Sequence, residues 1–171
     1  MISPQSGRGW QVSEQYAPGT DPAFRSLADD ELSALLGRQR FGALATGDDG
    51  SGRPQLSTVL YRWDAEQRVV RIATLADRAK VHRLHRDPRC ALYVASDGFD
   101  AYAVAEGSAE LSPVTSEPGD EVGRELLAMQ AGLADPADEG AFLRRMVADR
   151  RLVIRIRAAR LYGTALAPAP A

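Results

Sequence analysis

Residues 41–75 read FGALATGDDGSGRPQLSTVLYRWDAEQRVVRIATL, and this stretch decides the fold. It holds three β-like runs, Phe41–Thr46, Gln55–Trp63 and Val69–Leu75. Turn-forming residues separate the runs, at positions 47–52 and again at 64–67. Both connections are short enough for antiparallel hairpins. The stretch therefore predicts three antiparallel strands in succession.

The flanking sequence adds helices and further strands. A Ser-x-x-acid pattern at Ser26–Asp29 predicts a helix start, and proline at position 88 ends a second helix that we expect over 77–86. Two amphipathic helices are expected within 118–149, split at 132–136. The other predicted strands are Arg89–Ala95, Ala101–Leu111, and a last strand in which Leu152, Ile154 and Ile156 alternate with arginines. Six to seven mainly antiparallel strands with flanking helices predict an α+β fold around a closed or nearly closed barrel.

One domain accounts for the chain. Residues 1–25 are rich in Pro and Gly and predict an irregular N-terminal arm, residues 26–166 form the barrel domain, and 167–171 form a short tail. The arm carries Trp10, Tyr16 and Phe24. These aromatic residues could pack the arm onto the barrel or onto a partner subunit. The alternative is that the arm is a mobile tail.

Composition narrows the class of protein. Of 171 residues 44% are hydrophobic and 26% are charged, which is typical of a globular domain, and the net charge of -2 gives no basic footprint for nucleic acid. There is no signal-peptide core and no run of about 20 apolar residues. The single cysteine, Cys90, lies in an apolar run that favours a buried packing role. We expect a cytoplasmic protein with no nucleic-acid or membrane partner.

Common catalytic and metal-binding motifs are absent from the sequence. It has no phosphate-cradling glycine loop, no nucleophile elbow, no paired cysteines and no His-Glu-x-x-His. The two histidines, His82 and His85, lie three apart on a predicted helix and have no evident third ligand. We therefore predict no metal site.

The stretch 74–89, TLADRAKVHRLHRDPR, is the strongest candidate for an anion site. Thr74 ends a predicted strand, and Arg78 and Lys80 lie at the start of the following helix. Helix N-terminal amides, a hydroxyl and two cations suit a phosphate. Lys80 is the one lysine among 21 Lys and Arg residues, which singles it out. The alternative is a solvated basic helix balanced by nearby acids.

The strand after Pro54 is the second candidate. Alternation places Leu56, Thr58 and Leu60 on one face and Gln55, Ser57, Val59 and Tyr61 on the other. The mixed polar face suits a flat heteroaromatic ring with hydrogen-bonding edges. A half-exposed strand shows the same pattern.

Taken in order, several segments resemble the pyridoxamine-phosphate-oxidase-like FMN-binding split β-barrels, in particular the class B flavin and deazaflavin (F420-dependent) oxidoreductases. The resemblance covers about residues 27–163, and its segments are GALAT (42–46), GRPQLS (52–57), RAKV (78–81), RDPR (86–89) and the ending RLVIRI (151–156) to Tyr162-Gly163. It implies that Gln55, Ser57, Thr58 and Val59 line the ring and that Thr74, Arg78 and Lys80 hold the tail phosphate. It also implies a homodimer with the cofactor at the interface, where the partner's strand 101–111 closes the site.

The chain departs from the family pattern at Thr58, Leu60 and Arg83, where proline, an aromatic residue and asparagine are common. The added charge of Arg83 suits the polyglutamate tail of coenzyme F420. The resemblance thus implies an F420-dependent oxidoreductase that transfers a hydride to a small organic substrate. The alternatives are an FMN-dependent oxidoreductase and a non-enzymatic flavin or tetrapyrrole binder. Tyr61 and Tyr102 are candidate proton donors, although packing is the expected role of both.

Overall fold

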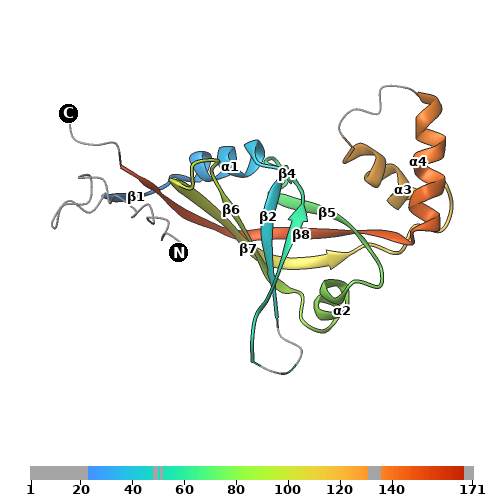
Figure 1. The fold of residues 1–171 in the computed structure, drawn as a ribbon, viewed down its shortest axis with the longest axis horizontal. Coiled ribbons are helices and arrows are strands. Elements are labelled where there is room, and N and C mark those ends of the chain that lie inside the picture. Colours follow the sequence, from blue (N-terminus) through green and yellow to red (C-terminus); the bar gives the residue numbers. More distant parts are fainter. Residues whose placement is uncertain (1–22, 48–49, 51, 131–135, 168–171) are drawn as a thin grey trace, which may run out of the picture.

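The computed structural model describes residues 23–47, 50, 52–130 and 136–167. Within these residues eight strands form one sheet in the order β3-β2-β6-β7-β8-β5-β4, with β1 beside β8 (Figure 1). Every pair is antiparallel. The strands are β1 (Phe24–Ser26), β2 (Phe41–Thr46), β3 (Gln55–Leu60), β4 (Arg62–Asp64), β5 (Val69–Leu75), β6 (Arg89–Ala95), β7 (Ala101–Leu111) and β8 (Arg151–Leu166). The helices are α1 (Asp29–Arg38), α2 (Ala79–Arg86), α3 (Glu121–Ala128) and α4 (Pro136–Ala148).

Tyr61 is the point at which the sheet curls. It separates β3 and β4, which lie at the two ends of the strand order. Its backbone N–H donates to Arg40 O at 2.9 Å, and its buried hydroxyl donates to Leu36 O at 2.7 Å. The single strand predicted over Gln55–Trp63 is therefore wrong. The chain leaves one sheet edge and enters the other at this residue, because the buried side chain of Tyr61 holds it against α1.

The inside of the curled sheet is the main hydrophobic core. Alternate residues of the strands fill it, and α1 contributes Leu32, Leu35 and Leu36, each at most 3% exposed. The strand residues that are buried there include Leu44, Val70, Ile72, Leu92, Val94, Ile154 and Ile156. The antiparallel half-barrel and its helices confirm the α+β split-barrel class.

The first helix begins later than the sequence pattern indicates. Ser26 is the last residue of β1 and pairs with Thr164 of β8, whereas α1 begins at Asp29. The Glu31 carboxylate accepts the N–H of Ala28 at 2.9 Å, so the cap forms with Ala28 and Glu31 and not with the predicted Ser26 and Asp29. Phe24 and Arg25, which the sequence analysis placed in the arm, pair with β8. Trp10, Tyr16 and residues 168–171 lie outside the described residues.

Strand β8 organises the sheet because it pairs with three other strands. It spans 16 residues, far beyond the predicted alternating segment, and pairs with β1, β5 and β7. A register shift at Glu106/Gly107 interrupts the β7–β8 ladder, and a Cβ at Gly107 would lie 1.9 Å from Arg157 O. Such a bulge increases the local twist and helps a sheet to curl.

Helices α3 and α4 confirm the predicted helical pair. They form a hairpin at one end of the long strands β7 and β8, while α1 lies toward the other end and α2 packs separately (Figure 1). Val122, Leu126 and Met146 of the hairpin are buried with Val153 of β8 in a second, smaller hydrophobic cluster. The hairpin therefore covers the outside of the barrel wall.

Candidate cofactor-binding site

The predicted anion site is a cluster of basic side chains on α2. The helix begins at Ala79, two residues after the predicted start, so Arg78 is its N-cap residue and Lys80 lies in its first turn. Val81 and Leu84 are 2% and 3% exposed and anchor the helix on the barrel. The first turn contains no acidic residue. The local sequence thus presents positive charge at a helix start, where the backbone amides already favour an anion.

We call Arg78, Lys80 and Arg83 the basic cluster. No hydrogen bond or ion pair joins their side chains to another residue of the described part of the chain, although Arg71, Arg89 and Arg155 all pair with carboxylates. Burial lowers the pKa of Lys80, and the positive charge of Arg78 lowers it further. An anion here would relieve this repulsion. Asp77 and Asp87 flank the helix, but among the described residues neither forms an ion pair with the basic cluster.

The predicted ring-binding residues of β3 lie on two faces. Gln55 and Ser57 are half-buried and Val59 is 5% exposed on the inner face, whereas Thr58 points outward. Neighbouring strand residues face opposite ways, so Thr58 cannot share one pocket with Ser57 inside a single chain. Because β3 is the last strand of the sheet and pairs with β2 on one side only, its other edge has free backbone groups for a ligand.

The two candidate regions lie at the same end of the barrel. Gln55 pairs with Thr46 at the end of β2, and α2 packs against β2 and β7. A Cβ on Gly47, just after β2, would lie 3.4 Å from Asp87 Oδ2 at the end of α2. The start of β3 is therefore close to α2. Thr74, near the end of β5, is 6% exposed, so its side chain is largely buried.

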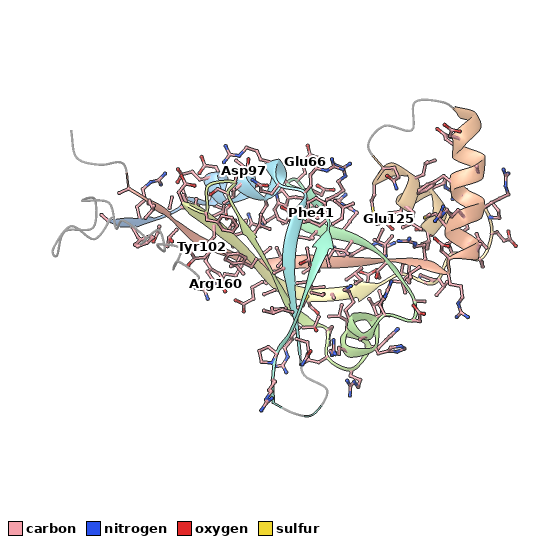
Figure 2. All side chains as sticks on the ribbon, viewed as in Figure 1. Phe41, Glu66, Asp97, Tyr102, Glu125 and Arg160 are labelled. Atoms are coloured by element: carbon pink, nitrogen blue, oxygen red, sulfur yellow. The ribbon has the colours of Figure 1, made fainter. Side chains whose placement is uncertain are left out.

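An apolar groove on the outside of β2 and β6 was missed by the sequence analysis. Its volume is about 470 Å³, and Thr58 lines it together with Phe41, Tyr93 and Phe99. These three aromatic side chains are 62%, 43% and 82% exposed, and Figure 2 shows Phe41 beside the strands that carry the groove. The signal was the alternation of β6, which buries Cys90, Leu92 and Val94 and so turns Tyr93 outward.

The two candidate proton donors both have packing roles. Tyr61 is 1% exposed, and burial raises the pKa of its hydroxyl above the ordinary value. Tyr102 stacks on Tyr93 with 5.4 Å between ring centroids. Cys90 is buried in the core, and this burial, together with the charge of Asp87, raises its pKa to about 12. Neither Tyr61 nor Cys90 is therefore poised for acid or base chemistry at neutral pH.

Comparison with known proteins places the chain in a family. A family model described as pyridoxamine 5'-phosphate oxidase matches residues 28–165. The chain belongs to the pyridoxamine 5'-phosphate oxidase family. Flavin-binding oxidoreductases are the general type of protein in this family.

Solved structures of this family's fold are similar to the chain over most of its length. An FAD-binding protein from Mesorhizobium loti is 18% identical with a TM-score of 0.60, covering 85% of this chain and 98% of that one. A conserved hypothetical protein from Mycobacterium tuberculosis is 23% identical with a TM-score of 0.61, covering 79% and 82%. An F420 reductase is 24% identical with a TM-score of 0.54, covering 75% and 94%. At these identities the likeness shows the shared fold.

The described residues offer neither a cluster of metal ligands nor a membrane-spanning helix. No group of three or more His, Cys, Asp or Glu side chains lies close enough together there to hold a metal ion. His82 and His85 are exposed on α2. Among the helices that the structure describes, none has the length and apolar character needed to cross a membrane.

Proposed function

We propose that this member of the family is an F420-dependent oxidoreductase that transfers a hydride between the deazaflavin and a small electrophilic organic substrate. The basic cluster carries the proposal, since Arg78, Lys80 and Arg83 have no partner among the described residues and lie on one short helix. Three cations exceed what a single phosphate requires. They suit a cofactor whose tail adds carboxylates to its phosphate.

The donor set on α2 fits the proposed tail. The amides at the start of α2 and the ammonium of Lys80 would bind the phosphate, while the planar fork of an arginine suits a carboxylate. Arg83 lies one turn further along the helix than Lys80, where the tail would continue. FMN, with a shorter tail, would leave Arg83 without a role.

The ring would lie against β3. Gln55, Ser57 and Val59, with the free strand edge, offer polar and apolar contacts to a flat heterocycle, whereas Thr58, on the opposite face, would contact a ring only in a site shared with a second copy of the chain. When bound, a reduced deazaflavin supplies the hydride chemistry. The chain's own part is to bind and orient the cofactor and to keep water away from the ring, so this function requires no dedicated acid or base.

A second copy of the chain would complete this site. The outer apolar face, which we define as Phe41, Leu56, Leu60, Tyr93 and Phe99, is 43% to 82% exposed in one chain. An exposed apolar patch of this kind marks an interaction surface. We propose a homodimer in which the partner's β7 closes the pocket over the ring.

The test is a pair of equilibrium titrations, one with F420 and one with FMN, followed by absorbance or fluorescence. We expect tighter binding of F420 and an affinity that falls as salt is raised, because the cluster's charges are partly exposed. Hydride transfer to electrophilic acceptors is then assayed with the reduced cofactor. Tighter binding of FMN than of F420 would mean that FMN is the cofactor. Binding of F420 without hydride transfer to any acceptor would indicate that the protein is a cofactor carrier.

A further inference from the structure

A second cavity lies between the α3–α4 hairpin and the barrel wall. Its volume is about 230 Å³, and it shares Arg62 and Met129 with a larger, more open cavity of about 910 Å³. Its walls are mostly apolar and include Leu60, Ala73, Leu126, Phe142 and Met146. Two arginines, Arg62 and Arg151, also line it. Such a cavity suits a ligand with an apolar body and one anionic group.

Charged contacts hold the hairpin in place over this cavity. The Glu125 carboxylate of α3 accepts from Arg155 Nη2 at 2.5 Å and from Arg71 Nε at 3.2 Å, and Figure 2 shows it between the hairpin and the long strands. Arg62 Nε donates to Met129 O at 2.9 Å, next to the end of α3. The cavity is therefore a preformed space beneath an anchored element.

Arg151 brings an unsatisfied donor to this cavity. Its Nε is buried with no hydrogen-bond partner, and it is the one such side-chain nitrogen or oxygen found among the described residues. The neighbouring Nη2 has only a long contact, 3.4 Å, with Asp149 Oδ2. Buried donors are nearly always paired in folded proteins, so the unpaired Nε–H leaves the guanidinium of Arg151 short of an acceptor.

We propose that this cavity binds a small amphipathic carboxylate, with a single carboxylate on a body about the size of one aromatic ring. The guanidinium of Arg151, whose side chain is 30% exposed, can offer a carboxylate two parallel N–H donors. The ring would pack among Leu126, Phe142 and Met146. The site shares Leu60 with the outer apolar face but uses none of the residues assigned to the cofactor, so its test does not depend on the proposed function.

The probe is benzoate, with benzamide as the neutral analogue of equal shape, measured by calorimetry on the full chain without cofactor. Benzoate is expected to bind at least tenfold more tightly than benzamide. Arg151→Met keeps the aliphatic stem and removes the donors, and is expected to weaken benzoate binding at least tenfold. Arg144→Met, on an exposed residue of α4 outside the cavity, is the matched control and should bind as the parent does.

Two more variants separate binding from folding. Asp149→Asn removes the carboxylate that shares Arg151, so benzoate binding should tighten several-fold. Ala73→Leu fills the cavity and should abolish binding while Arg151 remains. The proposal is overturned if benzoate and benzamide bind equally well. It is also overturned if the Asp149→Asn and Ala73→Leu proteins keep the parent's melting temperature and both bind benzoate as the parent does.

Discussion

Lys80 combines three properties that other basic residues of the chain do not share. It is the one lysine in the sequence, it lies in the first turn of α2, and both burial and the charge of Arg78 lower its pKa. A compact ammonium also enters a narrow phosphate pocket that a guanidinium would crowd.

Replacing Lys80 tests this interpretation. Lys80→Ala should weaken F420 binding by roughly 1.5 to 3 kcal/mol, about ten- to a hundred-fold, because a charge-assisted hydrogen bond is lost. Lys80→Arg should weaken binding less than alanine does. Arg86→Ala, on an exposed residue in the last turn, is the control and should have a smaller effect. If the Lys80→Ala protein has the affinity for F420 and the melting temperature of the parent, Lys80 does not bind the cofactor's phosphate.

Tyr61 has a structural role, so its replacement should lower the stability of the protein. Its hydroxyl donates to Leu36 O in the last turn of α1, where carbonyl groups lack helical partners. Tyr61→Phe leaves that buried carbonyl unsatisfied and should lower the free energy of unfolding by roughly 1–3 kcal/mol. Chemical denaturation measures the change. A fully stable Tyr61→Phe protein would mean that water satisfies Leu36 O.

At the scale of elements, two glycines predict opposite outcomes. Gly107→Ala should destabilise the protein strongly, since its Cβ would lie 1.9 Å from Arg157 O, a backbone atom of the neighbouring strand. Gly37→Ala is the matched change in α1, where the nearest atom is Trp63 Cδ1 at 3.8 Å. There alanine should stabilise by up to about 1 kcal/mol because of its higher helix propensity. Thermal melts of both variants test this prediction. Similar melting temperatures for Gly107→Ala and Gly37→Ala would contradict the close packing of Gly107 against Arg157.

The start of α3 gives the pH-dependent prediction. Partial burial opposes ionisation of Asp120, but backbone N–H groups of Ser116 and Gly123 donate to its carboxylate, and its pKa falls to about 2. Because the folded-state pKa is lowered, this stabilisation is complete above about pH 4 and is lost as the pH falls toward 2. The stability difference between the parent and Asp120→Ala should therefore shrink over that range. A constant difference would show that the carboxylate charge plays no part.

At the scale of the whole molecule, the outer apolar face predicts self-association. Light scattering should give about twice the 18.4 kDa chain mass. Leu56, 71% exposed on the outward side of β3, is the residue to change. Leu56→Glu should give the monomer, whereas Ala141→Glu on exposed α4 should leave the mass unchanged. A parent protein that is monomeric with cofactor present would exclude the shared site.

The elements themselves follow from local sequence. Val69–Leu75, Arg89–Ala95 and Ala101–Leu111 were predicted with the bounds that the structure has, because apolar alternation and turn residues act within a few positions. The basic cluster was equally visible, since its members lie within six residues on one helix. These features depend on short-range patterns, which a sequence displays directly.

Contacts between distant residues were decided by the tertiary structure alone. Nothing local to Tyr61 indicates that its hydroxyl reaches Leu36, so the break between β3 and β4 was not foreseen. Alternation shows that Ser57 and Thr58 face opposite ways, but which face the sheet encloses depends on how it curls. The cavity at Arg151 likewise forms only where α3, α4 and the barrel wall meet. Periodicity determines the faces of an element, and packing between elements decides which face is buried, which is open and which becomes a site.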